Sequence, residues 1–194
     1  MAMHTELWFP SAIWSCVLHN LDNNIIKEFA YDLKKQDRGR TLSNHGGYQS
    51  SDLKLGQCNE LDKLVSTLNA EVESICKQIA IYPLEIKNIW ININPQYCYN
   101  NLHNHVGSVL SGVYYVEAKE GNGNISFERT DGAENFLPAQ SIQTNYFNSY
   151  GSNYKSTTGA LYIFPGWLKH KVDSNKIKDD RISISFNYGV KNEN

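Results

Sequence analysis

The hydrophobic and polar positions of this chain follow two different periods, and the first half carries the helical one. Apolar residues recur three and four positions apart over residues 22–36, where Asp22 or Asn23 can cap the start of a helix. The same spacing runs over about residues 59–80, and Pro83 prevents that second helix from continuing. We therefore predict two amphipathic helices that each bury one face.

From about residue 84 onward, apolar and polar residues alternate as they do in a strand with one buried face. The predicted strands are residues 89–94, 110–116, 125–127, 160–164, 168–172 and 181–188. A further short strand is expected near Tyr48, inside the Gly- and Ser-rich loop 38–57. Helices followed by strands indicate an α+β fold, with helical support at about residues 20–82 and an antiparallel sandwich or barrel core at about residues 84–190.

Two segments fit neither period clearly. Residues 129–158 carry scattered Asn, Ser, Gly and Tyr, with a weak strand pattern at residues 141–146. Loops of this length are uncommon in compact domains unless they are functional, so this one is either a lid or substrate loop, or an excursion that contains a hairpin. Residues 7–10, Leu-Trp-Phe-Pro, are expected to be a first strand packed on the core rather than an exposed docking patch.

Composition narrows the class of protein. With 194 residues, 41% of them hydrophobic, the chain is expected to form a single domain over residues 1–194. A net charge of −2 argues against nucleic acids and acidic membranes as partners. Without a signal-peptide pattern or an 18-residue apolar run, a cytoplasmic protein is expected. No zinc or redox spacing relates the cysteines, which are expected to be structural thiols: Cys16, Cys58, Cys76 and Cys98.

Three histidines form a candidate metal site. His103 and His105 are two residues apart, so both side chains reach one ion if the segment is extended. His170 shares a strand face with Leu168 and Val172, which turns its imidazole inward. Neutral imidazoles suit iron, zinc, copper or nickel. The alternative is that the first two histidines are simply exposed in a surface loop.

Arg181 is a candidate anchor for an anion. It shares a strand face with Ser183 and Ser185, and this face is predicted to look into the interior. Because a buried arginine without an anionic partner is costly, and no acid falls on the inward face of the predicted strands, we expect it to bind a small-molecule carboxylate. A salt bridge to Glu128 or Asp131 is the alternative.

Polar side chains of neighbouring strands point toward the same interior. Asn94 shares a face with Trp90 and Asn92, and Ser111 shares a face with Tyr115. Asn94, Ser111 and Tyr115 are therefore further candidates for binding the small molecule.

At these residues the chain resembles the iron(II)- and 2-oxoglutarate-dependent oxygenases. The specific segments of the resemblance are residues 103–115, 164–172 and 181–187, and it extends to residues 7–10 and 46–50, so it covers nearly the whole chain. It implies a double-stranded β-helix, which is a cupin-like jelly-roll, with the metal at its open end and the N-terminal helices as its support.

The resemblance also implies roles for individual residues. His103 matches the first metal ligand of the family and His170 the last, and Arg181 matches the arginine that binds the distal carboxylate of 2-oxoglutarate. Ser183 matches the serine of an Arg-x-Ser pattern. Tyr115 falls where related prolyl hydroxylases place a tyrosine on the same carboxylate.

His105 departs from the family pattern, because an acid usually stands at its position. A site of three imidazoles lacks the negative charge of that carboxylate, so its iron would be held with one more unit of positive charge. In a shifted register, residues 105–107 would instead resemble halogenating relatives, in which a small residue replaces the acid.

The activity implied by the resemblance is that of a dioxygenase, an oxidoreductase that couples the decarboxylation of 2-oxoglutarate by Fe(II) and O2 to hydroxylation of a substrate. The sequence does not decide whether the primary substrate is a peptide, as in prolyl hydroxylases, or a small molecule. It does not decide the oligomeric state either, and a homodimer is one of the options. One competing hypothesis is a three-histidine cupin-type dioxygenase that does not use 2-oxoglutarate. Another is a non-catalytic binding jelly-roll with an aromatic-rich loop, which contains Tyr146, Phe147, Tyr150 and Tyr154.

Overall fold

The computed structural model describes residues 3–136 and 141–191. Its helices are α1 (Asn23–Gln36) and α2 (Asn59–Gln78), where the apolar spacing predicts them. Asp22 caps α1 by accepting a backbone hydrogen bond at 3.0 Å. Within the described residues, no helix has the length and apolar character needed to cross a membrane.

The strands of the described residues form two antiparallel sheets. In spatial order, the six-stranded sheet contains β1 (Trp14–Val17), β9 (Ala160–Pro165), β6 (Leu110–Glu117), β11 (Arg181–Val190), β4 (Leu84–Asn94) and β3 (Tyr48–Gln49). The five-stranded sheet contains β2 (Asn44–His45), β5 (Tyr99–His103), β10 (His170–Val172), β7 (Ile125–Glu128) and β8 (Gly151–Tyr154). Apart from the hairpin of β7 and β8 within the five-stranded sheet, strands β4 to β11 alternate between the two sheets in the manner of a double-stranded β-helix, which confirms the predicted fold.

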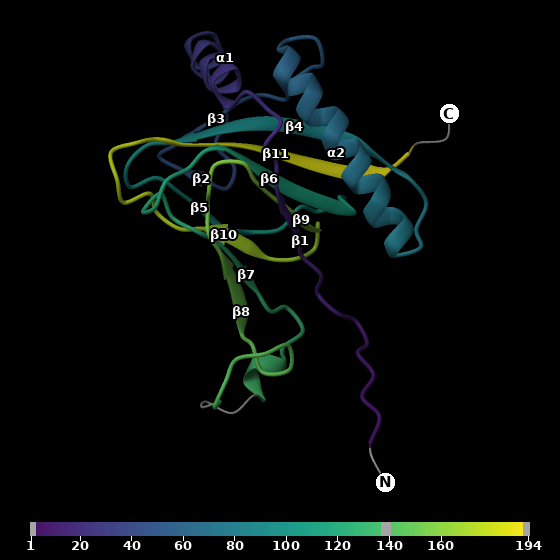
Figure 1. Cartoon of the computed structure of the whole chain (residues 1–194). Coiled ribbons are helices and arrows are strands. Elements are labelled where there is room, and N and C mark those ends of the chain that lie inside the picture. Colours follow the sequence, from purple (N-terminus) through teal and green to yellow (C-terminus); the bar gives the residue numbers. More distant parts are fainter. Residues whose placement is uncertain (1–2, 137–140, 192–194) are drawn as a thin grey trace.

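Both helices cover the outer face of the six-stranded sheet, and the second sheet lies on its other side (Figure 1). Apolar and polar residues alternate along β11, so one set of its side chains faces the helices and the other faces the second sheet. Ile182, Ile184 and Phe186 are fully buried in the core beneath the helices. Arg181 and Ser183 point the other way, into the space between the sheets, as the sequence predicts.

One expectation for the N-terminal region is wrong. Residues 7–10 are not a strand packed on the core, because Trp8 is 74% exposed and Phe9 is 94% exposed. Phe9 has φ 58°, outside the extended region, and Pro10 lacks a backbone donor, so pairing with β9 begins only at β1. Cys16 lies exposed on this edge strand, whereas the other three cysteines are buried, and all four are free.

The long segment after β7 contains a hairpin. β7 pairs with β8, and a short 3₁₀ helix (Ala133–Asn135) lies in the connection between them. Residues 141–146 form no strand. Figure 1 shows this arm extending away from the two packed sheets. Tyr146, Phe147 and Tyr150 of this arm are exposed, whereas Tyr154 on β8 is half-buried against Phe127.

Candidate metal centre and cosubstrate pocket

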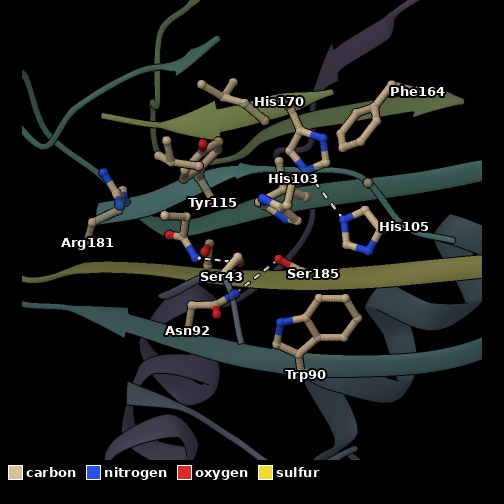
Figure 2. Close-up of a pocket in the computed structure, with 16 residues that line it drawn as sticks. Ser43, Trp90, Asn92, His103, His105, Tyr115, Phe164, His170, Arg181 and Ser185 are labelled. Atoms are coloured by element: carbon tan, nitrogen blue, oxygen red, sulfur yellow. Dashed lines mark hydrogen bonds between the residues drawn. The ribbon is translucent and has the colours of Figure 1, made fainter. Parts of the chain in front are cut away.

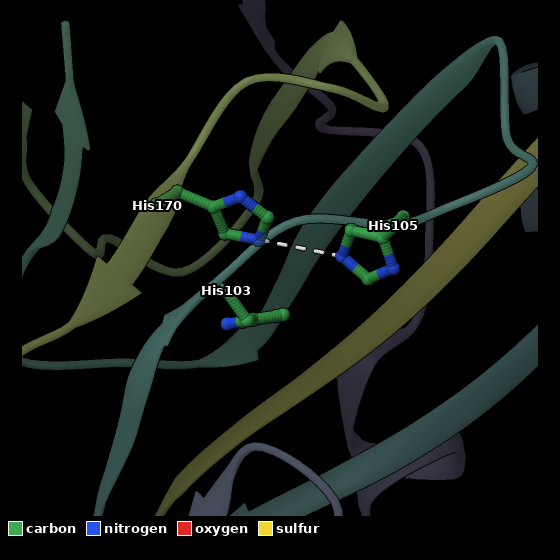
Figure 3. Close-up of side chains that lie close together, drawn as sticks. All are labelled: His103, His105 and His170. Atoms are coloured by element: carbon green, nitrogen blue, oxygen red, sulfur yellow. Dashed lines mark hydrogen bonds between the residues drawn. The ribbon is translucent and has the colours of Figure 1, made fainter. Parts of the chain in front are cut away.

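Three imidazoles converge between the two sheets. His103 at the end of β5 and His170 at the start of β10 are partners across the sheet, and His105 follows two residues beyond β5. One ring nitrogen of each lies within 4.8 Å of the others, and Nε2 of His105 is 3.3 Å from Nε2 of His170. Figure 3 shows the three rings facing one centre. The side chains predicted to share a metal site therefore lie together.

Backbone contacts fix the direction of each ring. Nδ1 of His103 is 2.7 Å from the Asn101 carbonyl oxygen, and Nδ1 of His170 is 2.9 Å from the Leu168 carbonyl oxygen. Because a carbonyl oxygen only accepts, both Nδ1 atoms carry the proton, which leaves the Nε2 lone pairs free for a metal. The backbone N–H of His105 donates to the Gly166 carbonyl at 2.8 Å, so its turn is tied to the turn that precedes His170.

The electrostatics of the cluster favour neutral rings. Burial lowers the pKa of His103, that of His105 to about 4 and that of His170 to about 3. All three imidazoles are therefore unprotonated at neutral pH, which is the state that binds metals. The cluster contains no carboxylate, so the charge of a bound dication would have to be balanced by other ligands.

A cavity runs between the sheets from this cluster to Arg181 (Figure 2). Trp90 and Phe164 line it beside the histidines. Arg181 lines the opposite end and is only 1% exposed. One cavity thus joins a metal-ligating end to a cationic end.

The cationic end has two donors without a partner. Nη1 of Arg181 donates to the carbonyls of Asn122 and Asp173, the latter at 3.0 Å, whereas Nη2 has no hydrogen-bond acceptor in the part of the chain that the structure describes. The hydroxyl of Tyr115 is also buried and unpartnered. Ser183, which lines the cavity as well, is in register with Tyr115 on the neighbouring strand. Two such donors fit a carboxylate, which accepts hydrogen bonds at both oxygens.

The alternative salt bridges of Arg181 do not form. Glu128 pairs with Lys171 at 3.0 Å, and Asp131 pairs with Arg129 at 2.6 Å. The expectation of an inward arginine that needs a carboxylate from outside the protein therefore matches the geometry.

Two other candidates, Asn94 and Ser111, do not line the cavity. The hydroxyl of Ser111 donates to Oδ1 of Asn187 at 2.7 Å. The amide of Asn94 lies against Gly47, where an added Cβ would come within 2.7 Å of Asn94 Nδ2. Both residues are on the predicted face of their strands, but too far along them to reach the cavity.

The sequence does not identify two polar residues that line the cavity, Ser43 and Asn100. Ser43 belongs to a segment predicted as loop, and Asn100 lies on β5, a strand that was not predicted. The register of β5 against β10 shifts between His170 and Val172, so the two-residue alternation of a regular strand does not predict which side chains of β5 face the cavity.

Comparisons with known proteins agree with this geometry. The family model described as "Putative 2OG-Fe(II) oxygenase" matches residues 88–187. No curated protein matches the chain. A Pseudomonas putida prolyl-4-hydroxylase structure is similar with a TM-score of 0.65 and 12% identity, covering 94% of each chain.

Two further prolyl hydroxylase structures have the same fold. The Trichoplax adhaerens enzyme, solved with a hypoxia inducible factor peptide fragment, matches with a TM-score of 0.66, 11% identity and coverage of 90% of this chain and 83% of that one. The collagen prolyl hydroxylase of Paramecium Bursaria Chlorella virus-1, solved with 2-oxoglutarate, matches with a TM-score of 0.62, 13% identity and coverage of 92% and 96%.

The family match spans more than half of the chain and includes both ends of the cavity, the three histidines and Arg181. This protein therefore belongs to the 2OG-Fe(II) oxygenases, a family of oxidoreductases that use iron and 2-oxoglutarate.

Proposed function

We propose that this oxygenase is a hydroxylase that holds iron(II) with His103, His105 and His170 and binds 2-oxoglutarate between that metal and Arg181. The observation that carries the proposal is the pairing of two unlike ends in one cavity. Three unprotonated imidazoles face one end, and two buried donors without partners face the other. A molecule with a chelating keto acid and a distal carboxylate matches both ends at once.

The protein's part at the metal end is to hold three ligands in fixed directions. The carbonyls of Asn101 and Leu168 set the rings of His103 and His170, which reduces the entropy lost when a metal binds. Iron(II) with 2-oxoglutarate and oxygen supplies the oxidising chemistry, in which the cosubstrate is decarboxylated to succinate and one oxygen atom enters the substrate. Trp90 and Phe164 line the same end and limit the access of water.

Three neutral ligands also couple the metal to the cosubstrate. With His105 in place of an acid, the described residues of the cluster provide no carboxylate to the metal, so the keto-acid carboxylate of 2-oxoglutarate would supply the negative charge there. Iron and 2-oxoglutarate are therefore expected to strengthen each other's binding, because each neutralises the charge that the other brings into a desolvated site.

The distal end is preset for one carboxylate. The carbonyls of Asn122 and Asp173 hold Nη1 of Arg181, so Nη2 is oriented before any ligand arrives. The Tyr115 hydroxyl supplies a second donor, and Ser183 lies beside it. Because the two donors and the metal ligands are fixed in position, the cavity favours a dicarboxylate whose length matches the distance between them.

For the primary substrate we propose a peptidyl residue, and for the compartment the cytoplasm. The likeness to prolyl hydroxylases, one of them in complex with a peptide fragment, supports the first. Four cysteines without a disulfide support a reducing compartment.

Turnover of the cosubstrate tests the proposal. Aerobic incubation with iron(II) and 2-oxoglutarate is expected to yield succinate from the wild-type protein and none from His170→Ala. The matched control is His45→Ala, which removes an exposed histidine that stacks on Tyr99 and does not line the cavity. Succinate formation that survives His170→Ala would overturn the assignment of the metal ligands.

A further inference from the structure

Three chain connections meet behind Arg181, at the end of the cavity that is remote from the histidines (Figure 2). They are residues 95–98 between β4 and β5, residues 118–124 between β6 and β7, and residues 173–180 between β10 and β11. Arg181 is the first residue of β11, so its backbone continues directly from the last of them. The contacts that join these connections therefore help to set the direction of the guanidinium.

Two asparagines join the connections, and both are fully buried: Asn122 and Asn175. Nδ2 of Asn122 donates to Oδ1 of Asn175 and to the Asp179 carbonyl, each at 2.9 Å. Nδ2 of Asn175 donates to the Asn94 carbonyl at 3.0 Å and to the Asp179 carbonyl at 2.8 Å. Each amide thus has an acceptor for both of its protons.

Neither amide can be turned around. Oδ1 of Asn122 accepts from the backbone N–H of Lys119 at 2.6 Å, and Oδ1 of Asn175 accepts from that of Ile177 at 3.0 Å. An amide N–H placed at either position would face another donor. The pair is therefore a buried network with satisfied donors and acceptors, and such a network makes the segments that it connects rigid.

This network fixes the two carbonyls that hold Arg181. Asn122 contacts Asn175 through its side chain, and its own carbonyl accepts from Nη1 of Arg181. The second carbonyl belongs to Asp173, two residues before Asn175, and accepts from Nη1 at 3.0 Å. Gly123, with φ 88°, lets the two connections approach, because an added Cβ would lie 2.9 Å from Nη1 and closer still to the Asp173 carbonyl oxygen.

These contacts hold the guanidinium without neutralising it, because carbonyls and amides carry no net charge. The acids of the same connection bind elsewhere or face solvent. Asp179 pairs with Lys119 at 3.1 Å, Asp180 accepts from the Tyr31 hydroxyl at 2.8 Å, and Asp173 is exposed. A guanidinium held by neutral groups keeps its charge for the carboxylate of a ligand.

We propose that Asn122 and Asn175 are positioning residues for the cosubstrate: together they orient Arg181 so that Nη2 is available to the distal carboxylate with its charge unpaired. Neither asparagine is among the residues that line the cavity, so both would act through Arg181. A donor that is oriented in advance loses less conformational entropy when the ligand binds. The inference rests on the proposed function in assigning Arg181 to 2-oxoglutarate.

Binding of two keto acids tests this role. 2-Oxopentanoate has the chain length of 2-oxoglutarate but no distal carboxylate, so it reports on the metal end alone. Each is titrated by calorimetry into the iron(II) protein without oxygen. Asn122→Ala and Asn175→Ala should each bind 2-oxoglutarate about tenfold more weakly, and 2-oxopentanoate as the wild-type protein does. A general loss of structure would weaken both.

The Arg181→Met background shows whether the asparagines act through Arg181. There Asn175→Ala should change the affinity for 2-oxoglutarate by less than about twofold, because no guanidinium is left to orient. Asn124→Ala is the matched control in both backgrounds. Asn124 belongs to the same connection as Asn122, but its side chain donates to Asn153 and takes no part in the network.

A measurement on the wild-type protein keeps the test valid if an alanine variant does not fold. With isotopically labelled arginine, nuclear magnetic resonance follows the guanidinium of the metal-free protein, and the Arg181 signal is identified by its loss in Arg181→Met. We expect its Nη1 protons to be protected from exchange before any ligand is added. Asn175→Ser, a smaller change than the removal of every polar atom, should reduce this protection.

Equal losses for the two keto acids, full 2-oxoglutarate affinity in both alanine variants, or an undiminished effect of Asn175→Ala in the Arg181→Met background would overturn the positioning role. Nη1 protons of Arg181 that exchange freely in the wild-type protein would overturn it too. Failure of the wild-type protein to bind 2-oxoglutarate would overturn the proposed function instead. The exchange measurement uses no ligand, so it keeps these two failures distinct.

Discussion

Replacing Arg181 with methionine is expected to remove most of the affinity for 2-oxoglutarate. Arg181 is 1% exposed, and its Nη2 is the cationic donor at the end of the cavity that has no acceptor among the described residues. Methionine has a similar length and fills the same space without a charge. The substitution therefore removes the anchor while it keeps the shape of the site.

The structure sets the size of the effect. One hydrogen bond to a charged group contributes about 1.5–3 kcal/mol, so losing the bond from Nη2 should raise the dissociation constant of 2-oxoglutarate by roughly 10- to 150-fold. Arg181→Lys keeps the charge but not the planar fork, and should fall between wild type and Arg181→Met. Tyr115→Phe removes one uncharged donor, with an expected loss of about tenfold.

Stability changes in the same variant have to be measured separately. Arg181→Met also leaves the carbonyls of Asn122 and Asp173 without this donor, which costs about 1–3 kcal/mol for the buried Asn122 carbonyl and less for the more accessible Asp173 carbonyl. Removal of a buried charge without an ionic partner offsets part of that cost. Urea unfolding of each variant shows whether it is folded under the conditions of the binding assay.

Anaerobic calorimetry of 2-oxoglutarate with the iron(II)-loaded variants checks the predicted order. Ser111→Ala is the matched control, because Ser111 also lies on the inward face of β6 but donates to Asn187 outside the cavity. A folded Arg181→Met protein that binds 2-oxoglutarate as tightly as wild type would refute the reasoning.

Three further predictions concern the metal ligands, pH and packing. His105→Ala should weaken zinc or iron(II) binding by more than about 100-fold in a competition assay, whereas His45→Ala, outside the cavity, should not; equal affinities would contradict a ligand role for His105. Because burial lowers the pKa of His105 to about 4 and that of His170 to about 3, the unfolded chain binds more protons than the folded one below pH 6.5. The metal-free protein should therefore lose on the order of 5 kcal/mol of unfolding free energy between pH 7 and pH 4.5, and a urea midpoint independent of pH in this range would argue against buried neutral rings. Gly112→Ala should destabilise the fold by about 1–3 kcal/mol in thermal or urea unfolding, because its Cβ would lie 2.3 Å from Cζ of Phe186 and 2.7 Å from the Tyr162 carbonyl oxygen; an unchanged midpoint would contradict this packing.

The sequence predicts best where one physical constraint dominates. In β11 the alternation of Ile182, Ile184 and Phe186 with polar residues fixes which side chains pack under the helices, and so places Arg181 and Ser183 between the sheets. The inward position of His170 follows from the same rule. Both conclusions depend only on the two-residue period of a strand.

The same period does not tell how far along a strand the cavity extends. Asn94 and Ser111 both face inward. Because Asn94 is at the end of β4 and Ser111 is near the start of β6, their side chains contact protein groups outside the cavity. Asn100 and Ser43 depend on a register shift and on a loop, neither of which has a local sequence signal. Depth along a strand and the course of a loop are set by tertiary packing, and these positions therefore required the structure.

The most direct test of the account is an anaerobic titration of iron(II) and 2-oxoglutarate into the metal-free protein, followed in the visible region. We expect the charge-transfer band of an iron–2-oxoglutarate complex in the wild-type protein, its loss in His170→Ala, and a need for much higher 2-oxoglutarate concentrations in Arg181→Ala. Iron that binds without producing this band in the wild-type protein would contradict the proposed site.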